Sequence, residues 1–388
     1  MPTIGSRLAS PMIVVALVPV LLAGLLSVGL TVPVGPFYWD LYVYLDAANR
    51  IADGQVPSVD FFTPVGPLGY WLFAGLANLF PSGQPLLVVQ WSLLAVTLPL
   101  LAPVLVEVGR QSRPTAFALL VPFLVFSLLP FNVEEYYPYP GVDGYGIYNR
   151  QVCQILYVLA AALVFVRRQG VLTAVIAGAM LALFLVKITG FIAGLMLAAI
   201  AFSAGRIALR SAVGAILVFA AVLSILEVWL GVTRAYLGDI VTLVSMNEGV
   251  ILSRFLQAGS LHFIAIAPLA ALTLTLLAFD ARGLLEAAGE ALRHPRLAAV
   301  ATLFDRDVVW VGGASFAGLF FETQNTGGQA FIFLWPILLQ VIWRSGRWSG
   351  APLALVLALV AASVLPTFME VIHRSARATV GQILYERL

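Results

Sequence analysis

Long apolar runs, broken by short polar segments, dominate the chain. One helix needs about 20 mainly apolar residues to cross a membrane, and about eleven runs approach or reach that length. The predicted spans are 11–33, 86–108, 114–131, 151–166, 171–186, 189–204, 211–230, 261–279, 308–321, 329–343 and 351–368. The pattern therefore predicts an all-α, polytopic membrane helix bundle of about eleven spans, formed by one domain over residues 1–388. The first run is long for a signal peptide and lacks a cleavage site, so we expect a retained anchor.

The first predicted outer loop, 34–85, contains two short helical patterns. From 41 to 53 the apolar residues recur on one face and the charged residues lie on the other, and Gly54 can end the helix. A second helix begins near Pro67 and carries Trp71 and Leu72 on its apolar side. Two short amphipathic helices after a span are typical of segments that lie in the membrane interface.

Arginine positions orient the predicted spans. One set of loops carries Arg7, Arg110, Arg113, Arg167, Arg168, Arg206, Arg210, Arg282, Arg293, Arg296, Arg306, Arg344 and Arg347. The positive-inside rule places these loops in the cytoplasm, provided that residues 66–80 lie along the membrane. The largest such loop, 280–306, has the pattern of a surface helix, whereas the loops 34–85, 132–150 and 231–260 face the other side. The bias toward Ala, Arg and Val is typical of GC-rich bacteria, so we expect a bacterial inner (plasma) membrane and an active face toward the periplasm or cell exterior.

Composition excludes several other classes of protein. The 388 residues are 61% hydrophobic and 10% charged, with a mean hydropathy of +0.99, which no soluble globular domain shows. A net charge of +2 without a basic tract gives no support for nucleic-acid binding. The single cysteine, Cys153, excludes a disulfide framework. The chain also lacks a P-loop, a dinucleotide fingerprint and a nucleophile elbow, and His262, His294 and His373 have no metal-ligand spacing, so we interpret them as structural.

Several carboxylates in the first outer loop admit two interpretations. Asp40 follows the first span and can cap the helix that starts at Leu41, or act as a general base at the lipid–water boundary. Asp46 and Arg50 are four residues apart, which favours a surface pair, although Arg50 can also reach a phosphate. Asp60 suits an Asx-type turn or the wall of a pocket.

The second outer loop is rich in tyrosine and acidic residues. Asp143 and Tyr145 lie in it, and Arg150 closes it at the head of the next span. An aromatic belt at the interface explains the tyrosines, but aromatic rings beside carboxylates also suit a sugar site. Arg150 can hold a phosphate or extend its charged end to the interface.

Two further polar positions border later spans. Lys187 is the only lysine in the chain and lies where two apolar segments meet. A charge at the bilayer centre costs about 2.5–3.5 kcal/mol on insertion scales, so such a residue is a functional candidate. Lys187 can bind a phosphate, or it can extend its charged end to the membrane interface. The two interpretations explain its position equally well. Gln324 and Asn325 belong to a polar turn that can line a substrate site.

The run from Asp40 to Trp71 resembles the first outer loop of GT-C glycosyltransferases, including the protein O-mannosyltransferase-like and aminoarabinose-transferase-like families. The matching elements are Asp40, Tyr44 to Ala47, Gly54 to Pro57, Asp60-Phe61 and Gly66-Pro67 to Trp71. Leu41 stands where the O-mannosyltransferases have a Glu after the Asp. The resemblance implies a polyprenyl-phosphate sugar donor, Asp40 as the catalytic carboxylate and Asp143 as a second one.

The function that we expect is transfer of a sugar from a polyprenyl-phosphate donor to an acceptor hydroxyl of a glycan, lipid or protein on the non-cytoplasmic face. Asp46, Arg50, Asp60, Tyr145, Arg150, Lys187, Gln324 and Asn325 are the candidate substrate-binding residues. A divalent metal ion is compatible with the carboxylates of the first loop, but no spacing fixes its ligands. The alternatives are a transporter or flippase of lipid-linked sugars, a polysaccharide polymerase or ligase, and a non-catalytic scaffold.

Overall fold

The computed structural model of the protein describes residues 10–35, 38–129, 141–246, 249, 251–294, 296–323 and 330–385. These residues form helices and no β-strand, which confirms the all-α prediction. In chain order the elements are α2 (Pro11–Ser27), α3 (Trp39–Ala52), α4 (Leu68–Leu79), α5 (Pro85–Ser92), α6 (Leu94–Gln111), α7 (Arg113–Leu128), α8 (Ile147–Phe165), α9 (Gln169–Val186), α10 (Ile188–Ser203), α11 (Leu209–Leu230), α12 (Val232–Ser245), α13 (Ile251–Leu261), α14 (Phe263–Arg293), α15 (Leu297–Phe304), α16 (Asp307–Glu322), η1 (Ala330–Leu334), α17 (Trp335–Arg344), η2 (Ser345–Arg347) and α18 (Gly350–Tyr385).

The bundle is built around α8, almost all of whose residues are buried. This helix contacts α6, α9, α10, α17 and η1, and its alanine run at 160–162 lets these neighbours approach closely. Gly190 of α10 lies so near that a Cβ there would be 2.5 Å from Cγ1 of Val152. Close packing on every side therefore fixes the position of α8 and of the polar residues at its N-terminal end.

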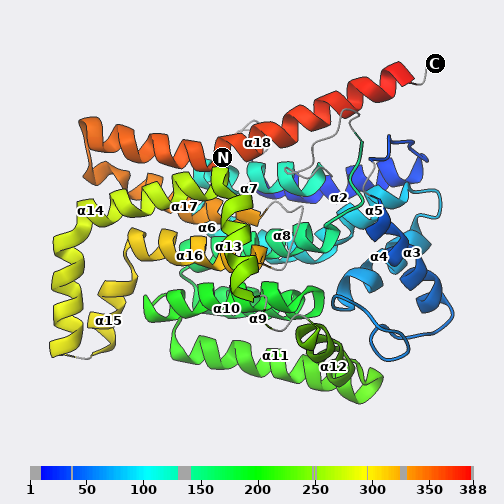
Figure 1. Cartoon of the computed structure of the whole chain (residues 1–388), viewed down its shortest axis with the longest axis horizontal. Coiled ribbons are helices and arrows are strands. Elements are labelled where there is room, and N and C mark those ends of the chain that lie inside the picture. Colours follow the sequence, from blue (N-terminus) through cyan, green and yellow to red (C-terminus); the bar gives the residue numbers. More distant parts are fainter. Residues whose placement is uncertain are drawn as a thin grey trace, which may run out of the picture.

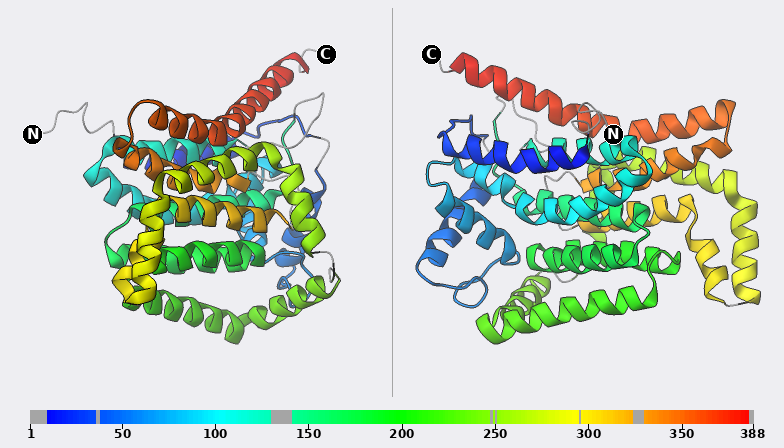
Figure 2. Two further views of the ribbon diagram at one scale, coloured as in Figure 1. Left: turned by 60° about the vertical axis from the view of Figure 1, so that its left-hand side comes forward. Right: turned by 180° about the vertical axis from the view of Figure 1, so that it is seen from behind.

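The bundle has two distinct ends. Helices α8 to α11 run side by side, with α3 and α4 at one end and α15 and the later part of α14 at the other (Figure 1). The view from behind in Figure 2 shows the same separation. The ends correspond to the predicted outer and cytoplasmic sides, respectively.

Among the described residues, six helical segments are long and apolar enough to cross a membrane. They are Pro85–Gln111, which combines α5 and α6, together with α8, α9, α11, α14 and α18. The apolar helices α2, α4, α7 and α10 are shorter. The length and composition of the six segments indicate a membrane protein. Every predicted span contains a helix, but the number of eleven crossings is not confirmed.

The two helices predicted in the first outer loop are present as α3 and α4. They pack against each other through Tyr44 of α3 and through Tyr70 and Phe73 of α4, all of which are buried. The turn that follows α3 returns toward the bundle, where Gly66 N–H donates to the carbonyl of Val186 at 2.9 Å. This bond attaches the first outer loop to the end of α9.

Helices extend beyond the predicted spans. The predicted outer loop 231–260 contains α12 and α13. A helix was predicted within 280–306, and it is present as the continuation of α14 from its span as far as Arg293. Likewise, α18 continues beyond its predicted end at residue 368 to Tyr385. Helix-favouring residues extend both patterns past the apolar run, and nothing in their sequence forces a break.

Ion pairs hold the arginine-rich end together. Arg206 donates to Asp305 at 2.6 Å, and Arg344 donates to Asp307 at 3.0 Å. Asp307 is buried and also pairs with Arg347. These contacts join the C-terminal ends of α10 and α17 to the beginning of α16, so the arginines here have structural partners in addition to their topological role.

The close approach at Gly66 provides a test of the fold. A Cβ at Gly66 would lie 2.2 Å from the carbonyl oxygen of Leu185, so the Gly66→Ala variant must separate the loop from α9. Overpacking of this kind costs about 1–3 kcal/mol. We expect a lower midpoint of thermal unfolding in detergent. The control is Gly75→Ala in α4, where nothing lies within 4 Å of the added Cβ; equal stability of the two variants would contradict this packing.

Candidate functional site

Asp40 lies at the junction between the first outer loop and α8. It is half-buried in the first turn of α3, and its Oδ2 accepts a hydrogen bond from Gly146 N–H at 2.8 Å. Gly146 precedes α8 and has a φ of +66°, a conformation that glycine adopts most readily. Asp40 therefore caps the start of α8. The prediction that it caps its own helix is wrong, because α3 begins at Trp39 with Tyr38 in the capping position.

Burial and two cations act in opposite directions on Asp40. Loss of water contact raises the pKa of its carboxyl above the ordinary value, while the Gly146 N–H, Arg150 and Lys187 partly lower it. Arg150 is fully buried, and its Nη2 donates to the carbonyl of Asp143 at 2.9 Å. The guanidinium thus holds the segment that presents Gly146 to Asp40.

Asp143 lies in the same junction through its backbone and its side chain. Val142 forms a short bridge with Val34, and the side chain of Asp143 is buried over Gly35, where a Cβ would lie 3.3 Å from Oδ1. The two predicted catalytic carboxylates therefore belong to adjoining parts of one junction. The Gly146 bond and the Arg150 bond connect them through the backbone of residues 143–146.

Lys187 occupies the single-residue connection between α9 and α10. Its Nζ donates to Oδ1 of Asn149 at 2.9 Å and lies 4.8 Å from the centre of the Tyr148 ring. Burial lowers the pKa of Lys187 to about 8, while the carboxylates of Glu322 and Asp40 act to raise it. A cation in contact with α8 is thus placed near Asp40 and loses its charge as the pH rises through about 8.

Aromatic side chains surround the Asp40 junction. Tyr44 donates to Oε1 of Gln151 at 3.3 Å, and its ring centre lies 4.9 Å from that of Tyr70. Burial raises the pKa of both tyrosines, so their hydroxyls remain protonated donors. On the exposed side, Trp39 makes an edge contact with Tyr145 at 5.7 Å. Tyr145 is therefore placed at the rim of the junction.

A second pair of ionisable residues lies close to Lys187. His262 Nε2 and Glu322 Oε2 are 3.0 Å apart, and both residues are buried. From the sequence alone, His262 was interpreted as structural, and Glu322 was assigned with Gln324 and Asn325 to a polar turn that can line a substrate site. The sequence feature that both residues share is their position. Each is an ionisable residue at the predicted outer end of an apolar run.

The other predicted binding residues have local partners. Asp46 and Arg50 form an exposed pair at 2.8 Å, and Arg50 also lies 5.2 Å from the ring centre of Phe61. Asp60 accepts a hydrogen bond from Val56 N–H at 2.6 Å, which closes a turn. These contacts explain the three residues without a ligand. Gln324 and Asn325 lie outside the described residues.

The described residues contain no group of three or more His, Cys, Asp or Glu side chains that could hold a metal ion. The charged groups that act most strongly on Asp40 are the cations Arg150 and Lys187, and Asp143 lies in the same junction. This environment suits an anionic ligand such as a phosphate.

The fold and this site define a helical membrane protein with a polar, ionisable cluster at the α3 end of its bundle. Comparison with known families finds no family model that matches the chain. The comparisons with curated proteins and with solved structures also find no match.

The influence of Arg150 on Asp40 can be measured directly. Removal of the cation in Arg150→Gln should raise the pKa of Asp40 further, because the carboxylate loses its attraction to the guanidinium. Infrared difference spectra recorded across pH follow the protonated carboxyl band, which the Asp40→Asn variant identifies. The matched control is Arg110→Gln at the opposite end of the bundle. A band that titrates at the native pH or below would contradict the described electrostatics.

Proposed function

We propose that this chain is a membrane glycosyltransferase that moves a sugar from a polyprenyl-phosphate donor to an acceptor hydroxyl on the non-cytoplasmic face. One observation carries the proposal. The half-buried carboxylate of Asp40, which follows the first apolar helix, is fixed by α8 within the field of Arg150 and Lys187. A base beside two cations is the arrangement that transfer from a lipid phosphate requires.

Asp40 is the general base of the proposed reaction. The Gly146 bond fixes the orientation of its carboxylate, and its raised pKa makes the ionised form a stronger base than an exposed aspartate. In the transfer step the bond between the sugar C1 and the phosphate oxygen breaks, and both electrons remain on that oxygen. The acceptor oxygen forms the new bond to C1, with inversion, and its proton passes to Asp40.

Lys187 and Arg150 are the phosphate-binding residues of the proposal. The phosphate gains negative charge as the sugar leaves, so a nearby cation stabilises the transition state more than the ground state. Lys187 is charged below its pKa of about 8 and neutral above it. Donor binding is therefore strong at neutral pH and declines as the pH rises through about 8.

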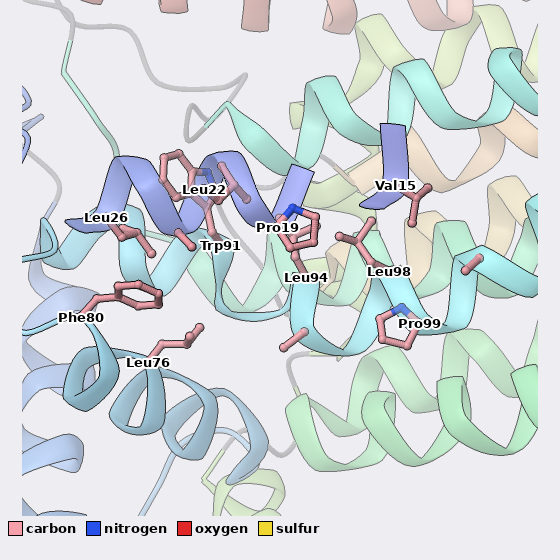
Figure 3. Close-up of a pocket in the computed structure, with 13 residues that line it drawn as sticks. Val15, Pro19, Leu22, Leu26, Leu76, Phe80, Trp91, Leu94, Leu98 and Pro99 are labelled. Atoms are coloured by element: carbon pink, nitrogen blue, oxygen red, sulfur yellow. The ribbon is translucent and has the colours of Figure 1, made fainter. Parts of the chain in front are cut away.

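An apolar cavity gives the lipid tail of the donor a place in the bundle. It has a volume of about 440 Å³ and lies between α2, α4, α5 and α6, lined by side chains such as Leu22, Phe80, Trp91 and Leu98 (Figure 3). Helix α4 borders the cavity near its C-terminal end and contacts the Asp40 junction through Tyr70. A chain of isoprene units is apolar throughout, so it matches this lining.

A transporter or flippase of lipid-linked sugars is the second candidate. Buried polar side chains such as Arg150, Gln154 and Glu322 within apolar helices are features that transport pathways share. The two functions differ in their requirement for a closed membrane. A transferase works in detergent, whereas transport can be observed only across a sealed bilayer.

The Asp40→Asn variant tests the catalytic assignment. Loss of the base should reduce sugar transfer by about 10²–10⁴-fold. Thermal stability should stay close to native, because the amide oxygen can still accept the Gly146 bond. Transfer is measured in detergent with a panel of labelled polyprenyl-phosphate sugars, and Asp53→Asn on exposed Asp53 is the control. Native-like transfer by the Asp40 variant would refute the assignment.

Orientation is tested by labelling of introduced cysteines in whole cells. The native Cys153 is fully buried and should stay unlabelled by a membrane-impermeant maleimide, which makes the native protein its own control. We expect Asp53→Cys to react in intact cells and Glu286→Cys to react only after permeabilisation. Both positions are exposed; Asp53 follows α3 and Glu286 belongs to the later part of α14, and these two segments lie at opposite ends of the bundle (Figure 1). The reverse pattern would place Asp40 on the cytoplasmic side.

A further inference from the structure

The pair of His262 and Glu322 lies outside the machinery assigned above, yet it borders Lys187. His262 connects α13 to α14, and Glu322 is the last residue of α16. The preceding residue, Phe321, presents its ring 6.0 Å from Nζ of Lys187. Helix α16, which is remote in sequence from the Asp40 junction, thus reaches Lys187, and His262 contacts α16 through Glu322.

Lys187 is in this way enclosed by charged and titratable groups from several elements. Glu322 faces it from α16, Asp40 from α3, and Cys153 and Tyr148 from α8. Nε2 of His262 lies 3.0 Å from Oε2 of Glu322. Of these groups, Glu322 exerts the largest attraction on the lysine, ahead of Asp40.

We propose that Glu322, oriented by His262, is a positioning residue that keeps Lys187 charged and therefore able to bind the phosphate of a lipid-linked donor. The inference rests on the proposed function and adds a residue to its donor site. A lysine that loses water contact favours its neutral form unless an anion stands close by. Asp40 cannot supply that anion throughout the reaction, because it accepts the acceptor's proton. Glu322 does not accept a proton in the proposed reaction, so it can keep the lysine charged during transfer.

The proposal predicts a particular dependence on pH. In Glu322→Gln the pKa of Lys187 falls below about 8, because the largest attraction is removed. Near pH 6.5 the variant and the native protein should differ least in phosphate binding, because the lower pH favours the charged lysine in both. At pH 8 the variant has less charged lysine than the native protein, so its Kd should exceed the native Kd by about threefold or more.

Arginine provides the decisive rescue, because its guanidinium stays charged at every relevant pH. If Glu322 acts only through the charge of Lys187, the double variant Glu322→Gln/Lys187→Arg should bind as tightly at pH 8 as Lys187→Arg alone. If Glu322 only supports the fold, the double variant should stay weak. The matched charge-loss control is Glu286→Gln on exposed Glu286 of α14.

The experiment measures binding of farnesyl phosphate, a short polyprenyl monophosphate, to each purified full-length variant in detergent at pH 6.5 and pH 8. Farnesol serves as the uncharged ligand. Native and variant are compared at the same pH, so changes in the charge of the phosphate cancel. The inference would be overturned if Glu322→Gln bound farnesyl phosphate at pH 8 with the native Kd, or if arginine at position 187 did not restore binding. Either result would leave the proposed function standing. If the native protein shows no preference for farnesyl phosphate over farnesol, the proposed function fails as well.

Discussion

The hydrogen bond from Gly146 N–H to Asp40, together with the bond from Tyr44 to Gln151, connects the first outer loop to the central helix of the bundle. The first N–H groups of a helix have no hydrogen-bond acceptor within the helix. At the start of α8, the carboxylate of Asp40 from α3 is such an acceptor. The negative charge also lies where the helix dipole is positive. Because α8 is fixed by close packing on all sides, the bond gives Asp40 a rigid position despite its place in a loop.

The remaining buried charged side chains lie near side chains of opposite charge. At the α3 end, Arg150 and Lys187 act on Asp40, and Glu322 acts on Lys187. At the opposite end, Asp305 and Asp307 receive Arg206, Arg344 and Arg347. An uncompensated charge in an apolar bundle is costly, which explains why both ends contain networks rather than single ions. The difference lies in exposure: Asp40 stays partly accessible, whereas Asp307 is closed in.

Local patterns allowed the sequence to predict the all-α class, the helices α3 and α4, and the four-residue spacing that joins Asp46 to Arg50. Ionisable residues at the borders of apolar runs also identified Asp40, Arg150 and Lys187 as candidates. The partners of these residues could not be predicted. Gly146 is 106 positions from Asp40, and the contact of His262 with Glu322 depends on how α13, α14 and α16 pack. The continuity of α14 from its span into the predicted surface helix, and the extent of α18, were missed because hydropathy marks where a membrane span ends, not where a helix ends.

The position of Lys187 also has a chemical consequence. It is the only lysine in the chain, so apart from the terminal amine it is the sole primary amine available to acylating reagents. Its pKa of about 8 leaves a far larger neutral, nucleophilic fraction at pH 7.5 than an ordinary lysine has. Mild acylation followed by mass spectrometry would therefore modify one side chain within the fold, at the α3 end of the bundle. The extent of that modification would report how far a reagent reaches this buried amine.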